Sequence, residues 1–115
     1  MLQQDYGAAQ AGFGDFLKRF PGHALVPNAL YWLGETYYVQ KNYSDAAEAF
    51  DIVLSAHGNS NKAPDSQLKK AMALSLLGKN ADACSALRQL AVKFPNAPTH
   101  VKSKADSERR RVGCS

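Results

Sequence analysis

Apolar residues recur at helical spacing on both sides of a short polar break between residues 27 and 57. Two inward faces can be assembled from them, namely Leu30, Leu33, Gly34 and Tyr37, then Ala46, Ala49, Phe50 and Val53. Residues 41–43 interrupt the pattern, and Ser44 with Asp45 offers a helix N-cap. The stretch therefore predicts a helical hairpin.

The hairpin pattern recurs every 37 residues. Equivalent positions carry similar residues in three successive units, as in Ala9, Ala46 and Ala83, and in Phe13, Phe50 and Leu87. A fixed period built from helix, turn and helix is typical of an α-solenoid, in which each unit buries its apolar face against its neighbours. We therefore expect an all-α fold, an α-solenoid of about two and a half repeats with a C-terminal capping helix.

The period also divides the chain, which at 115 residues is expected to be one domain over residues 1–115. Residues 5–26 are interpreted as the second helix of a truncated first repeat. Residues 27–63 and 64–97 form the second and third repeats, and residues 98–111 form the capping helix.

Two of the expected helices carry features that predict their packing. The helix over residues 65–77 should end at Gly78 as a C-cap. Its inward positions are Leu68, Ala71, Leu74 and Leu77. The helix over residues 5–19 is weakened by three glycines, Gly7, Gly12 and Gly14. It must depend on packing, and Phe13 and Phe16, without a preceding helix to cover them, mark a place for self-association or domain swapping.

These residues resemble the tetratricopeptide repeat (TPR) family. The pattern is carried by Leu33, Gly34, Tyr37, Ala46 and Phe50. The repeat is about three residues longer than the usual 34, with the excess in residues 57–63. More narrowly, the run from Pro27 to Tyr38, PNALYWLGETYY, is similar to the C-terminal TPR domains of the YbgF family of the Tol-Pal system, also called cell division coordinator CpoB. The resemblance covers residues 5–110.

This resemblance implies a non-catalytic protein-binding module in the periplasm of a Gram-negative bacterium. The implied partner is TolA, and the implied role is to coordinate septal peptidoglycan synthesis with outer-membrane constriction during cell division, with the peptidoglycan synthase machinery as a further contact. Members would carry a signal peptide and a trimerising coiled coil upstream, and neither pattern occurs in this sequence. The alternative is a TPR scaffold of another envelope assembly, of the outer-membrane assembly lipoprotein type, or a self-associating structural module.

The resemblance also implies a protein-binding groove. In TPR folds, positions two, five, nine and twelve of each first helix point into a concave groove. The matching positions are Asn28, Tyr31, Glu35, Tyr38, Asp65, Leu68, Met72 and Ser75. Tyrosines, leucine and methionine together suit an amphipathic helix or an extended segment. TPR domains that clamp a chaperone's C-terminal carboxylate use lysine and asparagine at positions five and nine, so Tyr31 and Glu35 argue against that ligand.

A second interpretation of the same residues stays open. Tyr31, Leu68 and Met72 can instead pack within the solenoid and be unavailable to a partner. Trp32, next to the groove positions, is expected to pack between units rather than to contact a ligand.

Residues that could support catalysis or bind a metal are scattered. His23, His57 and His100 fall in expected loops or at helix ends, without a carboxylate or cysteine at metal-ligand spacing. No nucleophile elbow or phosphate-binding loop occurs in the sequence. We therefore expect no enzyme activity, no cofactor and no metal site.

The two cysteines, Cys84 and Cys114, have no CxxC spacing. Three interpretations remain open: a disulfide between them in an oxidising compartment, an inert thiol at Cys84 in the solenoid, or a disordered or intermolecularly paired Cys114.

The formal net charge is +4, and the basic residues gather in the C-terminal half. Most belong to expected outer helix faces, namely Lys69, Lys70, Lys102, Lys104, Arg109, Arg110 and Arg111. No aromatic residue is interleaved with them, as nucleic-acid binding would favour. We expect a solvated face first, an acidic protein patch second, and nucleic acid or anionic lipid last. No apolar run approaches the roughly 20 residues of a membrane span.

Overall fold

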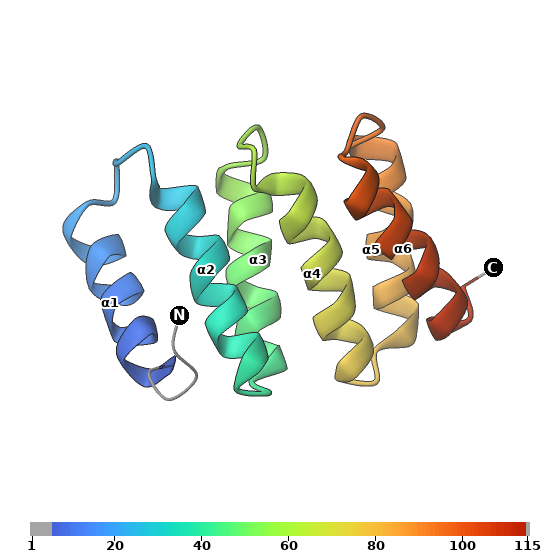
Figure 1. Cartoon of the computed structure of the whole chain (residues 1–115), viewed down its shortest axis with the longest axis horizontal. Helices are drawn as coiled ribbons and strands as arrows, with labels where there is room; N and C mark the ends of the chain where they lie inside the picture. Colours follow the sequence, from blue (N-terminus) through green and yellow to red (C-terminus); the bar gives the residue numbers. More distant parts are fainter. Residues whose placement is uncertain (1–5, 115) are drawn as a thin grey trace.

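A computed structural model describes residues 6–114 as a row of antiparallel helices (Figure 1). The six helices are α1 (Tyr6–Arg19), α2 (Val26–Val39), α3 (Tyr43–Ala56), α4 (Ala63–Leu76), α5 (Asn80–Lys93) and α6 (Thr99–Val112). Each has 14 residues, and no strand occurs among the described residues. The expected α-solenoid is thus confirmed, and Asp5, the predicted start of the first helix, lies outside the described residues.

Burial follows the predicted repeat of 37 residues. The buried positions of α2 are Val26, Ala29, Leu30, Tyr31, Gly34 and Thr36. Those of α4 are Ala63, Ser66, Gln67, Leu68, Ala71 and Ala73, each 37 positions later. The same interval relates the buried residues of α3 to those of α5, which are Ala83, Ala86, Leu87 and Leu90. One packing arrangement is therefore used twice.

Helices α2 and α3 approach each other closely at Gly34. A Cβ placed there would be 2.6 Å from Cε1 of Phe50. Phe50 is fully buried between Tyr31, Ala46 and Ala73. Glycine is therefore needed at this position because the phenyl ring occupies the space of a side chain.

Two of the predicted helix ends differ from the structure. Helix α3 begins at Tyr43, so Ser44 lies inside it and Asn42 occupies the N-cap position. Helix α4 ends at Leu76, so Leu77 is 38% exposed rather than inward. Gly78 follows with φ +79°, and its N–H donates to the carbonyl of Ser75 in a Schellman-type ending.

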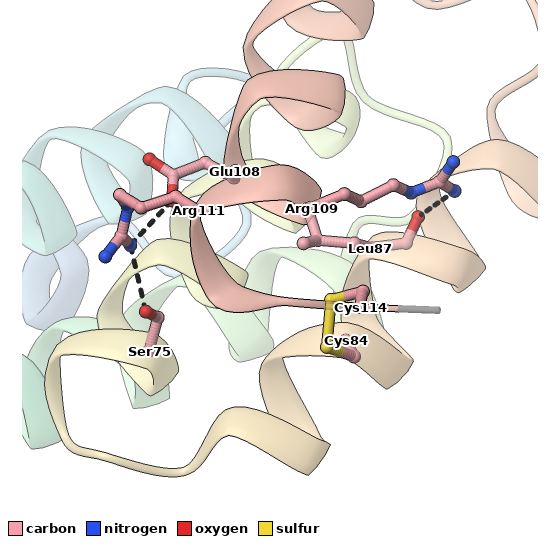
Figure 2. The surroundings of a disulfide bond; sticks show 7 residues. All are labelled: Ser75, Cys84, Leu87, Glu108, Arg109, Arg111 and Cys114. Atoms are coloured by element: carbon pink, nitrogen blue, oxygen red, sulfur yellow. Dashed lines mark hydrogen bonds and ion pairs between the residues drawn. A yellow bond between two sulfur atoms is a disulfide. The ribbon is translucent and has the colours of Figure 1, made fainter.

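The capping helix α6 is fastened at its C-terminal end. Val101 and Ala105 are buried with Leu68 and Leu87 in the core of the third repeat. Cys114, just beyond α6, forms a disulfide with Cys84 near the start of α5 (Figure 2). Of the three interpretations of the cysteines, the intramolecular disulfide is the one found.

Candidate functional site

The predicted groove positions belong to α2 and α4, and we call the surface that these two helices share with α6 the α2–α4–α6 face. Side-chain contacts join its helices. From α4, Lys69 reaches Glu35 of α2, and Asp65 reaches His100 of α6. Six of the eight predicted residues are at least partly exposed, namely Asn28, Glu35, Tyr38, Asp65, Met72 and Ser75. Asn28 also lines a hollow between α1 and α2. Their role in binding stays a prediction.

The other two predicted residues, Tyr31 and Leu68, are buried and belong to the core. Tyr31 is 8% exposed, and its ring centroid lies 5.7 Å from that of Phe50. Leu68 is 5% exposed and packs in the cluster that contains Val101. For these two positions the packing interpretation is correct, because large side chains there fill the space between successive hairpins. Met72 is intermediate, since it is partly buried against the same cluster.

A cluster of charged and aromatic groups joins α2 to α4. Lys69 Nζ lies 3.3 Å from Oε1 of Glu35 and 5.2 Å from the ring centroid of Tyr38. Tyr38 also packs edge-on against Tyr43, with 5.3 Å between ring centroids. Together these contacts hold a half-buried aromatic ring beside an ion pair, so the surface offers both stacking area and charge.

Tyr31, in the core, and Tyr38, on the face, both have raised pKa values. Burial raises the pKa of the Tyr31 hydroxyl, and the nearby carboxylates of Glu35 and Asp65 raise it further. Burial also raises the pKa of Tyr38, with the neighbouring Tyr43 adding to the effect. Both hydroxyls therefore keep their protons to more alkaline pH than an ordinary tyrosine, and can act as hydrogen-bond donors.

The C-terminal end of the face is organised by α6, as Figure 2 shows. Arg111 donates from Nη2 to Oγ of Ser75 at 2.9 Å and from Nε to Glu108 at 2.8 Å. Glu108 is itself buried and also lies 3.6 Å from Lys104. Arg111 therefore connects the end of α6 to α4. The hydroxyl of Ser75, a predicted groove residue, already accepts a hydrogen bond from it.

Many of the basic side chains are paired with carboxylates rather than free. Carboxylate oxygens lie within 4.0 Å of Lys69, Lys70, Lys104, Arg109 and Arg111. The positive charge of the C-terminal half is thus divided among local ion pairs. A single uninterrupted basic surface does not form from these five residues.

Two lysines that contact α2 were not among the predicted site residues. Lys62 Nζ lies 4.9 Å from the ring centroid of Tyr31 and 5.3 Å from that of Trp32. Lys69 forms the ion pair with Glu35 described above. The repeat could have revealed both, because Leu25 and Trp32 stand 37 positions earlier and face the preceding unit. Trp32 lies between α1 and α2 as expected, yet it is 42% exposed.

Neither a membrane span nor a metal-binding cluster is found in residues 6–114. None of the helices in that range has the length and apolar character needed to span a bilayer. Over the same residues, no three His, Cys, Asp or Glu side chains converge in a way that could hold a metal ion.

Two models of known protein families match this chain. A family model described as tetratricopeptide repeat matches residues 3–66, which is more than half of the chain. A second model with the same description matches residues 65–97. No curated protein matches the sequence at a significant level.

Proposed function

We propose that this chain, which belongs to the tetratricopeptide repeat family, serves the Tol-Pal system of the bacterial envelope as a periplasmic domain that binds TolA. Stacked helical hairpins of this family are protein–protein interaction modules, and their extended surfaces bind other proteins. The finer assignment rests on the similarity of the run from Pro27 to Tyr38 to the YbgF family.

The observation that carries the proposal is the partly exposed row of groove positions on the α2–α4–α6 face. Glu35, Tyr38 and Met72 offer a carboxylate, a hydroxyl-bearing ring and an adaptable apolar side chain. This mixture suits a segment that presents both apolar and basic or hydrogen-bonding groups. Tyr31 and Leu68 contribute to this surface indirectly, because their buried side chains fix the positions of α2 and α4.

A periplasmic location is supported by the disulfide between Cys84 and Cys114, because disulfides persist in oxidising compartments and are rare in the cytosol. In the proposed setting, the domain would coordinate septal peptidoglycan synthesis with outer-membrane constriction. A trimeric assembly would then be the task of an upstream coiled coil and not of this domain.

The proposal is tested by titrating the domain with the soluble periplasmic part of TolA, measuring heat and the fluorescence of Trp32. We expect saturable one-to-one binding that Tyr38→Ala weakens at least tenfold. The matched control is Val92→Ala, because this side chain is 79% exposed and belongs to α5, which is not part of the α2–α4–α6 face. Absence of heat and of a fluorescence change would contradict the TolA assignment, and equal affinities for the two variants would contradict the groove.

A further inference from the structure

Helix α6 contributes few apolar side chains to the core of the third repeat. Its buried apolar residues are Val101 and Ala105. Ala105 stands 37 positions after Leu68, so α6 has a methyl group where α4 has a large core side chain. No side-chain hydrogen bond caps the start of α6, and a helix of 14 residues is only marginally stable by itself in water. Apolar packing therefore holds α6 less firmly than it holds α4.

A buried carboxylate makes the docking of α6 less favourable still. Glu108 is 5% exposed and stands 37 positions after Ala71, a core residue of α4. Its ion partners, Lys104 and Arg111, both belong to α6. They accompany Glu108 whether α6 is docked or detached. Docking thus removes water from the carboxylate without giving it a cation from another helix.

The C-terminal end of α6 is connected to its neighbours by two arginines and a disulfide (Figure 2). Arg111 donates a hydrogen bond to Ser75 of α4, and Arg109 donates from Nη2 to the carbonyl oxygen of Leu87 at 3.3 Å. The side chain of Arg111 is 52% exposed, and hydrogen bonds at such positions add little to stability. The bond between the two cysteines is covalent and opens only by a redox reaction.

We propose that the bond between Cys84 and Cys114 is a redox latch, a covalent link that keeps α6 docked and so makes the α2–α4–α6 face depend on oxidation. In the dithiol form α6 detaches, and two predicted groove residues, Asp65 and Ser75, lose their partners on α6. The inference deepens the proposed function and rests on it, since it concerns regulation of the same face. The movement of α6 can nevertheless be measured without a partner.

The latch closes by thiol–disulfide exchange with a disulfide-bearing oxidoreductase. One cysteine thiol loses its proton and attacks a sulfur of the oxidoreductase's disulfide, and the other thiolate then resolves the mixed disulfide. Cys84 and Cys114 together lose two protons and two electrons, and the oxidoreductase leaves as a dithiol. Both cysteines are partly exposed, so they are accessible to this reaction. Because disulfides form in oxidising compartments, the face is completed only after the chain reaches one.

Hydrogen exchange followed by mass spectrometry tests the latch in the whole chain. The oxidised chain is compared with the double variant Cys84→Ser with Cys114→Ser, called the serine variant, and with the same chain reduced by dithiothreitol. Without the bond, we expect the amides of α6 to exchange at least tenfold faster, whereas those of α3 keep their rates. The reduced chain keeps the test informative should the serine variant fail to fold.

A further substitution separates a latch from a general loss of stability. In the serine variant, Glu108→Ala removes the buried carboxylate and introduces the side chain that α4 has at Ala71. It should slow the exchange of α6 at least tenfold. The matched control is Ser107→Ala at the neighbouring exposed position, which should have a smaller effect. The proposal is overturned if α6 keeps its protection without the bond, if α3 and α6 lose protection by the same factor, or if the two alanine variants behave alike.

Titration with the soluble periplasmic part of TolA connects the latch to the proposed function. We expect the serine variant to bind at least tenfold more weakly than the oxidised chain. If the oxidised chain does not bind while the protection of α6 still depends on the bond, the TolA assignment fails and the latch is supported. If both forms bind equally well, control of the face by oxidation is overturned.

Discussion

Replacing Gly34 by alanine should destabilise the protein, although alanine is the better helix former. The added Cβ would lie 2.6, 2.8 and 2.9 Å from three carbons of the Phe50 ring. Favourable separations between carbon atoms are about 3.5–4.0 Å. Phe50 is fully buried between Tyr31, Ala46 and Ala73, so its ring cannot move aside without displacing another helix.

The magnitude of the loss is set by two opposing effects. Alanine gains about 1 kcal/mol of helix propensity over glycine, and overpacking a closed core costs about 1–3 kcal/mol. The net change for Gly34→Ala should be a loss of up to about 2 kcal/mol. Gly12→Ala supplies the control, since its Cβ meets nothing within 4 Å and should stabilise by about 1 kcal/mol.

A compensating substitution sharpens the test. The third repeat has Ala71 and Leu87 where the second has Gly34 and Phe50. The double variant Gly34→Ala with Phe50→Leu should therefore be more stable than the sum of the single changes predicts, by about 1–2 kcal/mol. Urea unfolding followed by circular dichroism gives the four free energies of the cycle. A steric conflict with Phe50 is refuted if Gly34→Ala stabilises as much as Gly12→Ala, or if the cycle shows no coupling.

Three further predictions concern the disulfide, the helix ends and the tyrosines. Reducing the disulfide between Cys84 and Cys114, which are 30 residues apart, should lower the free energy of unfolding by up to about 3.6 kcal/mol, measured by urea unfolding with and without reductant. Lys41→Gly should raise the melting temperature and Gly78→Ala should lower it, each by the equivalent of about 1 kcal/mol, because both positions have positive φ. Above pH 10, the ordinary pKa of tyrosine, stability should fall by about 1.4 kcal/mol per pH unit, since the raised pKa of Tyr31 keeps a proton on the folded chain that the unfolded chain loses. Tyr31→Phe should flatten that decline, and an unchanged alkaline profile would contradict it.

The helices and their inward faces could be predicted because each unit repeats the same local pattern. Phe50 and Leu87 occupy equivalent positions, so the inward face assigned in one unit can be checked against the next unit. Helix ends were harder to predict, because no side-chain hydrogen bond caps the starts of α2 to α6. Ser44 is a good N-cap by type, yet α3 begins one residue before it, and no side chain caps the backbone of that helix start.

The candidate site could be predicted only in part, because exposure depends on neighbouring helices. By the repeat pattern alone, Tyr31 and Leu68 should face the groove. They are buried instead, because side chains of α3, α4 and α6 pack against them. The pairing of Cys84 with Cys114 could be given only as one of three open interpretations, since it depends on α6 bringing its C-terminal end to the start of α5. The repeat places Lys62 and Lys69 beside α2, but which groups these long side chains contact depends on their rotamers, which periodicity does not specify.

The link between Cys84 and Cys114 also determines how the molecule would bear mechanical force. A pull applied at the C-terminus passes through the sulfur atoms into the start of α5, so α6 and the loop before it carry no load. The 30-residue span between the cysteines then adds no length when the solenoid is stretched. Fully extended, that span would measure about 100 Å. Under tension, the helices before Cys84 would bear the load, whereas the segment from Cys84 to Cys114 would stay shielded until the bond is reduced.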